Sequence, residues 1–312
     1  MIKNIIRKAI SFVEMPVKRT NWYKYQWIET NNYPTNEWYR SHDERNFDIV
    51  NIGSSNAVYA FDYNQTNVKA FNWALQPQSM ESGFKILKNF FSILGPKGIV
   101  TIPLGPFSGL SVSGKWAQSL VDRYYGILDP SLIDNYENVA YRHAHPFLSS
   151  PVESIKRLIK DIPPKSSVKK CNTDEEFRND ALRWIDGWKN EFSINDLSAP
   201  LSEQNIDGMK IRQELVGRMI DFCKERDLIP VIVLPPVHET LAQYFDSSFK
   251  KHYISDFLNG IDLSDVQCID WLNPIDCPFR LTDSDFLNSF FLSKIGAQKF
   301  TAAYINQLNE LL

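Results

Sequence analysis

The chain contains a series of short apolar runs, each bounded by turn residues, a pattern that predicts buried β-strands. The first run begins at Phe47 and ends in Gly53-Ser54-Ser55. Four further runs predict strands at 68–74, 99–104, 227–236 and 266–271. The run at 227–236 is apolar over most of its length, as a central parallel strand should be, and Pro235-Pro236 ends it.

Apolar residues between these runs recur at helical spacing and predict the intervening helices. Residues 80–94 carry one such stripe, formed by Phe84, Leu87, Phe90, Phe91 and Leu94. Residues 209–226 carry another, and residues 296–311 predict a closing helix. Because strands and helices alternate, the sequence predicts an α/β fold, a flavodoxin-like parallel five-stranded sheet with helices on both faces.

The alternation stops between residues 105 and 207, where helical pieces are expected at 117–125 and 153–162. We interpret 105–207 as a large, mostly helical insertion that covers the site, and 47–104 with 208–312 as the α/β domain. Residues 1–46 are expected to form an N-terminal helix and an irregular aromatic arm. The arm's aromatic residues could stack on sugar rings or an acyl group, or fill a local core: Trp22, Tyr23, Tyr25, Trp27, Tyr33, Trp38 and Tyr39.

Composition narrows the class of protein. The 312 residues are 43% hydrophobic with a net charge of −3, so a full core is expected and nucleic acid is not an expected partner. The four cysteines are scattered without a C-x-x-C pair, which argues against a zinc site or a disulfide scaffold. No apolar run could cross a bilayer, and the N-terminus lacks the features of a signal peptide, so we expect a cytoplasmic protein.

The first helix has an amphipathic pattern. Its apolar residues can share one face, while Lys3, Arg7 and Lys8 point elsewhere. Such a helix could lie on an anionic membrane surface or pack on the domain. The apolar residues are Ile2, Ile5, Ile6, Ala9, Ile10 and Val13.

The candidate chemistry lies where the predicted strands end. In parallel sheets, ligands bind beyond the carboxyl ends of the strands, and the N-terminus of a helix there stabilises an oxyanion. Ser55 follows the first strand directly, so we predict it as a nucleophile, with the alternative that Ser54 or Ser55 only caps the helix. Ser54, Asn56, Asn72, Gly105 and Asn288 are expected at the same edge as groups that bind an oxyanion or substrate.

The order of elements resembles the SGNH (GDSL-like) hydrolase superfamily, in particular its divergent members found beside surface-polysaccharide and teichoic-acid genes. Gly53-Ser54-Ser55-Asn56 stands where the family has Gly-Asp-Ser or Gly-Ser-Ser, which implies that Ser55 is the nucleophile. Residues 283–301 have the frame of the family's last block, which carries Asp-x-x-His-Leu. Here Asn288 and Phe291 take the places of the Asp and the His. The likeness covers 47–104 and 209–311.

A replacement base is needed if Ser55 is to act near neutral pH. His238 follows the fourth strand and is our candidate, its ring oriented by Asp270, Asp283 or Asp285; alternatively it caps its own helix or lines a groove. His143 and His145 form a second candidate pair, brought in by the insertion, for substrate or, in an extended segment, for metal. We expect no metal and no cofactor.

These features predict a serine esterase or O-acyltransferase that acts on a surface-polysaccharide sugar or its precursor. The expected partner is a carbohydrate or an acyl donor of low molecular weight. Two alternatives stay open. One is a catalytically inactive relative that binds glycans or serves in assembly. The other is a serine-independent transferase with His143, His145 or His238 as its base.

Overall fold

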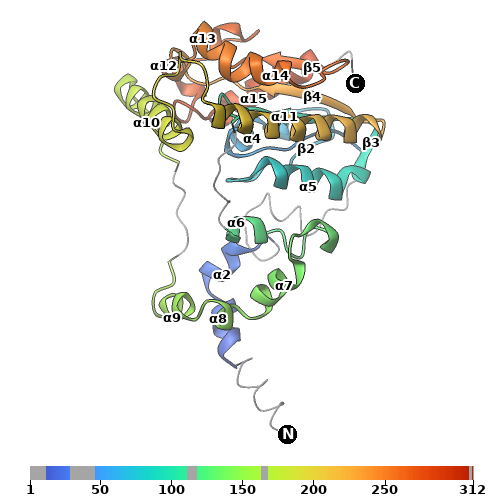
Figure 1. Cartoon of the computed structure of the whole chain (residues 1–312), viewed down its shortest axis with the longest axis vertical. Helices are drawn as coiled ribbons and strands as arrows, with labels where there is room; N and C mark the ends of the chain where they lie inside the picture. Colours follow the sequence, from blue (N-terminus) through green and yellow to red (C-terminus); the bar gives the residue numbers. More distant parts are fainter. Residues whose placement is uncertain (1–11, 29–45, 111–117, 163–167, 309–310, 312) are drawn as a thin grey trace. The chain divides into compact units, whose positions relative to one another are not determined.

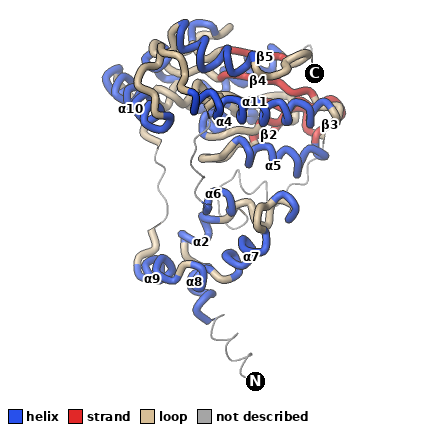
Figure 2. Tube along the Cα trace, viewed as in Figure 1, coloured by secondary structure: helices blue, strands red, loops and turns tan. Residues whose placement is uncertain are grey.

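The structure is a computed structural model that describes residues 12–28, 46–110, 118–162, 168–308 and 311. It divides into two compact units. Residues 1–43 and 116–168 form the helical unit, and residues 44–115 and 169–312 form the sheet unit. All labelled strands belong to the sheet unit (Figures 1 and 2). Because the units are separate bodies, each is described by itself.

The sheet unit contains five parallel strands in the order β2-β1-β3-β4-β5. The strands are β1 (Phe47–Asn51), β2 (Ala70–Asn72), β3 (Leu94–Pro103), β4 (Ile229–Leu234) and β5 (Gln267–Asp270). This strand order is that of flavodoxin-like folds, so the predicted fold class is confirmed (Figure 1). Every strand falls at a predicted apolar run, although β2 is shorter than expected.

The register aligns the carboxyl ends of the strands. Asn51 of β1 stands beside Asn72 of β2 and Thr101 of β3, and the pairing continues from β3 through β4 to β5. The segments that follow these strands therefore emerge at one edge of the sheet, which we call the carboxyl edge. The predicted site residues Ser55, Gly105 and His238 all lie in such segments.

Helices cover both faces of the sheet. α4 (Ser55–Ala60) and α15 (Lys294–Gln307) pack with the strand residues Ile49, Ile99 and Val231 in one core. α5 (Met80–Phe90) and α11 (Glu203–Lys224) contact each other and cover the opposite face (Figure 1). The alternation of side chains along a strand explains how both faces become apolar.

Local capping sets where the main helices begin. Ser79, Ser202 and Ser293 each accept a hydrogen bond from a backbone N–H in the first turn of α5, α11 and α15. The shorter helical segments of the unit are η1 (Tyr63–Gln65), η2 (Phe91–Ile93), α12 (Glu239–Ala242), α13 (Ser247–Phe249), η4 (Lys250–Ser255), α14 (Asp256–Asn259), η5 (Pro274–Asp276) and η6 (Asp283–Asp285).

The predicted insertion has different limits in the structure. α10 (Asp174–Phe192) belongs to the sheet unit, because Phe177 and Ala181 are buried there and the Cys171 N–H donates to the Leu287 carbonyl at 2.8 Å. Only residues 116–168 group with the N-terminal segment. The sequence offered no signal for this division, since the contacts that create it are long-range.

The helical unit consists of short helices around a small aromatic core. A helix at residues 12–18 precedes α2 (Asn21–Gln26). The others are α6 (Gln118–Asp122), η3 (Pro130–Leu132), α7 (Tyr136–Ala144), α8 (Pro146–Ser149) and α9 (Pro151–Ile159). Tyr23, Trp27 and Val139 form the buried centre.

One prediction for this unit is wrong, because residues 21–26 of the expected irregular arm form a helix. Thr20 caps α2, and the Asp161 carboxylate accepts hydrogen bonds from the N–H groups of Asn21 and Trp22 at 2.6 and 3.3 Å. This capping group comes from far along the chain, so local periodicity could not indicate it. Tyr33, Trp38 and Tyr39 lie outside the described residues, as do residues 1–11 of the predicted amphipathic first helix. Within the described ranges, no helix is both long and apolar enough to span a membrane.

Candidate functional site

The turn between β1 and α4 is built around Gly53. Its φ of +135° is a conformation that residues with a side chain rarely adopt, and a Cβ there would lie 2.6 Å from the Ala57 Cβ. The glycine therefore lets α4 begin close to the strand end. This places Ser54, Ser55 and Asn56 at the carboxyl edge, as the sequence predicts.

Ser54 serves the loop that follows β2. Its hydroxyl accepts a hydrogen bond from the Gln78 N–H at 3.1 Å, and the Gln78 amide donates to the Gly53 carbonyl at 2.9 Å. Ser54 also occupies the N-cap position of α4, without a side-chain cap bond. In the described part of the chain, no hydrogen bond reaches the half-buried Ser55 hydroxyl. Ser55 is thus the open hydroxyl of the pair.

Asn72 is fully engaged in holding the strand ends together. Its amide oxygen accepts from the Asn51 amide at 2.7 Å and from the Ala74 N–H at 3.0 Å. Its amide nitrogen donates to the Ala57 carbonyl at 2.9 Å. The side chain therefore connects β1, β2 and α4, and its N–H groups do not point at the Ser55 hydroxyl. The geometry does not support the predicted oxyanion role.

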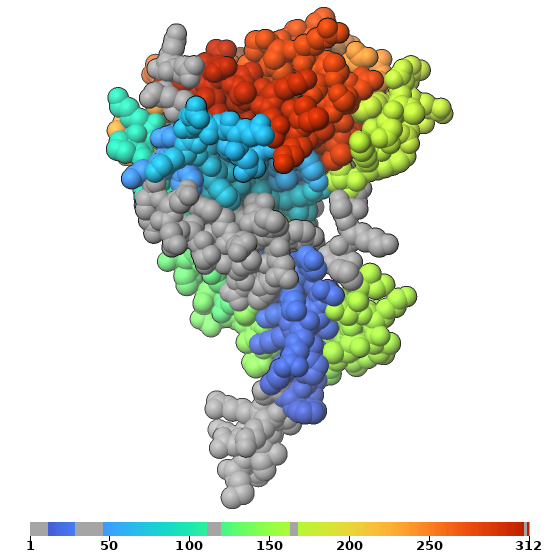
Figure 3. Space-filling view, turned by 180° about the vertical axis from the view of Figure 1, so that it is seen from behind, coloured from blue at the N-terminus to red at the C-terminus, as the bar shows by residue number. Residues whose placement is uncertain are grey.

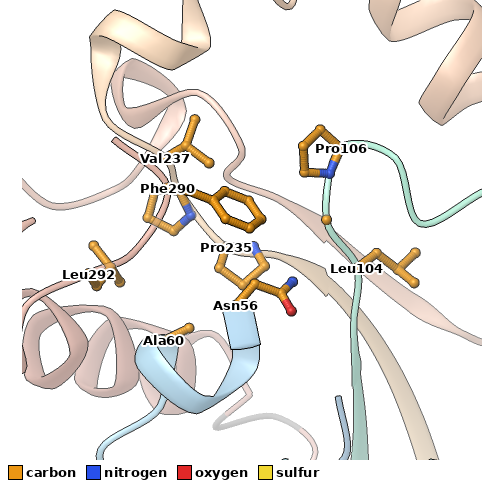
Figure 4. Close-up of a pocket in the computed structure, with 10 residues that line it drawn as sticks. Asn56, Ala60, Leu104, Pro106, Pro235, Val237, Phe290 and Leu292 are labelled. Atoms are coloured by element: carbon orange, nitrogen blue, oxygen red, sulfur yellow. The ribbon is translucent and has the colours of Figure 1, made fainter. Parts of the chain in front are cut away.

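Gly105 and Asn56 line a small pocket at the carboxyl edge, and Ser55 is not among its lining residues. The Gly105 N–H donates to the Ser108 hydroxyl at 2.7 Å, so it is committed to the turn after β3. The pocket has a cavity volume of about 10 Å³, roughly what one water molecule needs. Figure 4 shows the Phe290 ring extending across it toward the segment of Leu104 and Pro106.

His238 caps α12 instead of facing the pocket. Its Nδ1 accepts a hydrogen bond from the Thr240 N–H at 3.2 Å, and its Nε2 lies 3.3 Å from a carboxylate oxygen of Asp283. The ring is buried, stacked on Phe177 at 4.0 Å and edge-on to Phe286. The pocket is lined by the preceding residue, Val237. No hydrogen bond joins His238 to Ser55 among the described residues.

The predicted orienting carboxylates have separate tasks. Asp270 accepts a hydrogen bond from the Leu272 N–H at 3.0 Å. Asp285 is buried and pairs with Lys299 at 2.7 Å while accepting from the Thr282 N–H at 2.9 Å. Burial alone would raise the pKa of Asp285, but the hydrogen bonds from Lys299 and Thr282 hold it below its ordinary value. Only Asp283 reaches His238, so Asp285 does not orient the ring.

The last block of the chain is a packed loop. Asn288 accepts hydrogen bonds from the N–H groups of Phe290 and Phe291 at 3.0 and 2.9 Å, which is a turn-forming role. Phe291 is buried and stacks on Tyr59 at 4.6 Å. Asn288 is thus a backbone support and Phe291 a core aromatic ring.

An aromatic group beside the pocket was not predicted from the sequence. Trp184 and Trp188 of α10 lie one helical turn apart, stack at 5.3 Å, and contact Phe290 at 4.8 and 5.1 Å. All three rings are partly exposed. We call them the aromatic wall. The i, i+4 spacing of the two tryptophans in a polar stretch was a signal for it, although nothing local placed α10 next to Phe290.

His143 and His145 belong to the helical unit. The His143 ring packs edge-on to Trp27 at 4.9 Å, and the His145 Nδ1 lies 3.9 Å from the Glu14 carboxylate. In the described ranges, no three His, Cys, Asp or Glu side chains are grouped so that they could hold a metal ion.

Neither a scan against known protein families nor a search of curated proteins finds a match to this chain. The chemistry must therefore be argued from the site itself. The carboxyl edge offers the Ser55 hydroxyl and the Asn56 amide, and Asn56 shares a pocket with the partly exposed Phe290. It offers no imidazole or carboxylate directed at Ser55 within the described structure.

Proposed function

We propose that this chain is a non-catalytic relative of the SGNH hydrolases that binds a carbohydrate at the carboxyl edge of its sheet. One observation carries the proposal: both ring nitrogens of His238 are engaged by its own helix and by Asp283. The surface-polysaccharide context comes from the resemblance of 47–104 and 209–311 to that superfamily.

The loss of catalysis follows from the missing base. A serine hydroxyl is a weak nucleophile near neutral pH unless a neighbouring group takes its proton. Asn288 and Phe291 have structural tasks, and the buried His238 ring is locked between Phe177 and Phe286. Turning His238 toward Ser55 would cost these contacts and the helix cap.

The side chains at the carboxyl edge favour a carbohydrate as the ligand. The three residues of the aromatic wall are partly exposed, and aromatic rings suit the apolar faces of sugar rings. Asn56 lines the same small pocket as Phe290, and its amide can bond sugar hydroxyls. A surface with aromatic contact area and a few polar groups is the usual composition of such sites.

The first test is labelling with a fluorophosphonate probe, which reacts with activated serines. We expect the wild-type chain and Ser55→Ala to show equal, background labelling and no turnover of p-nitrophenyl acetate. Labelling of the wild type that disappears in Ser55→Ala would contradict the proposal.

The second test is binding to an array of bacterial surface oligosaccharides. We expect saturable binding by the wild type, binding at least tenfold weaker for Trp188→Ala, and unchanged binding for Phe222→Ala. Phe222 is the control because it is also a partly exposed ring in a cluster, but on α11 among Phe84, Phe91 and Arg226. Equal loss in both variants would point to general destabilisation.

A second candidate function is the predicted esterase or O-acyltransferase. One observation favours it: Ser55 begins α4, and among the described residues no acceptor bonds the backbone N–H groups of Ser55 and Asn56, which could hold an oxyanion. Labelling that depends on Ser55 would select this function over carbohydrate binding.

A further inference from the structure

The helical unit carries an exposed apolar face on α9. Val152 and Ile159 are 67% and 82% exposed, and Ile155 and Leu158 are also exposed. With 100° between successive residues, these four side chains fall within an arc of about 120° on the helix. Figure 3 shows this segment at the molecular surface, in yellow-green beside the blue residues 12–28.

Most surface helices turn their apolar face inward, whereas α9 turns its apolar face outward. Its buried residue is Ser154, whose hydroxyl donates to the Pro146 carbonyl at 3.2 Å. The apolar arc faces outward instead of packing on the small core of Tyr23, Trp27 and Val139. Clustered apolar side chains that remain exposed mark an interaction site in most proteins.

Basic residues flank the arc. Both lysines are exposed: Lys156 lies within α9, and Lys160 is the residue directly after it. Glu153 pairs with Arg157 at 2.6 Å and lies 4.0 Å from the exposed Lys156, and Asp161 caps α2, so cations outnumber the acidic groups here. The outward face of α9 is therefore apolar with a cationic border.

We propose that α9 docks this chain on the surface of an anionic phospholipid bilayer. The helix lies in the plane of the membrane, with its apolar arc inserted below the headgroups. Lys156 and Lys160 extend along the border and reach the lipid phosphates. Leu148 of α8, which is also exposed, lies just before the helix and adds to the inserted surface.

The size and charge of the face favour a membrane over a protein partner. A stable protein interface buries about 800 Å² on each partner, which four aliphatic side chains on one nine-residue helix do not supply. A bilayer needs no complementary shape, and an anionic one also attracts the cationic border.

The unit holds α8 and α9 firmly enough to present this face. The Glu14 carboxylate accepts hydrogen bonds from the Phe147 and Leu148 N–H groups at 2.8 and 3.3 Å, which caps α8. Asp161 ties the chain just after α9 to the start of α2. The face is thus part of a folded unit.

The test is flotation of the full chain with vesicles of phosphatidylcholine alone or with 30% phosphatidylglycerol. The key variant is Val152→Ser/Ile155→Ser/Ile159→Ser. The matched control is Ile211→Ser/Ile275→Ser/Ile295→Ser, which removes three equally exposed apolar residues from the sheet unit. Thermal melts of both variants verify that they fold.

We expect the wild type and the control to float with the anionic vesicles, and the α9 variant to bind at least tenfold more weakly. Lys156→Gln/Lys160→Gln should weaken binding to the anionic vesicles by about tenfold. Absence of wild-type binding, or equal binding by the α9 variant and the wild type, overturns the proposal. The second result would place any membrane contact elsewhere, for example in residues 1–11.

Discussion

At the scale of single residues, the polar side chains at the carboxyl edge mostly hold the backbone in place. Asn72 bridges two strands and a helix, Asn288 forms a turn, and His238 caps α12. A residue that has all its hydrogen-bond partners inside the fold cannot also position a substrate without breaking them. Ser55 is the exception, and it is where a ligand would find an open hydroxyl.

At Asp285, the contribution of such a polar side chain to the stability of the fold can be measured. We expect Asp285→Asn to lower the free energy of unfolding by about 2 kcal/mol at pH 7, because the carboxylate is buried and holds Lys299 and Thr282. Its pKa in the folded chain lies below the unfolded value. The stabilisation is therefore complete above the unfolded pKa of about 3.9 and is lost as the pH falls through the folded pKa.

Urea titrations between pH 7 and pH 3 measure this difference. The gap between wild type and Asp285→Asn should be constant down to about pH 5 and shrink below about pH 4. The control is Asp207→Asn, since Asp207 forms an exposed pair with Lys210 and should change stability by less than about 0.5 kcal/mol. A gap that does not depend on pH would mean that the charge of Asp285 is unimportant.

At the scale of elements, the turn from β1 into α4 positions the candidate site. Gly53→Ala should lower the free energy of unfolding by about 2 kcal/mol or more, because its φ is +135° and its Cβ would meet Ala57 at 2.6 Å. Gly187→Ala is the matched control. Gly187 lies inside α10 with no atom within 4 Å of its Cβ position, so alanine should stabilise by about 0.5–1 kcal/mol.

Chemical denaturation of both variants measures these changes in the free energy of unfolding. A small or absent effect of Gly53→Ala would show that the turn can relax, and would remove the argument that this glycine sets the entry of α4. Opposite signs at the two positions are the expected result.

The strands and helices show how much of the fold could be predicted from the sequence. Each strand followed an apolar run, and α5, α11 and α15 followed a 3.6-residue stripe or a capping serine, because these signals are local. The long helix α10, which Thr173 caps, was not predicted. α2 escaped notice because its second cap, Asp161, is distant in sequence. The aromatic wall could not be predicted for the same reason, because Trp184 and Phe290 are distant in sequence and come into contact only in the folded chain.

The candidate site, too, could be predicted only in part from the sequence. The strand-turn-helix motif placed Ser54, Ser55 and Asn56 at the carboxyl edge correctly, since parallel strands share their ends. It could not say which way the His238 ring points. That direction depends on Thr240, Asp283 and the stacking of Phe177, and two of these come from other elements.

At the scale of the whole molecule, the two units have separate buried clusters. Among the described residues, the aromatic centre of the helical unit and the cluster on one face of the sheet share no residue. The candidate carbohydrate site belongs to one unit and the α9 face to the other. A chain of this kind can bind a ligand with one unit and a membrane with the other.

Separate cores predict separate unfolding. Trp27→Leu should lower the stability of the helical unit by about 2 kcal/mol, and Phe300→Leu that of the sheet unit by about 1–2 kcal/mol, because each removes a fully buried ring. Differential scanning calorimetry should then show two transitions, each variant lowering the midpoint of one by a few degrees. If both variants shift one shared transition equally, the units unfold as a single cooperative body, and their cores stabilise each other.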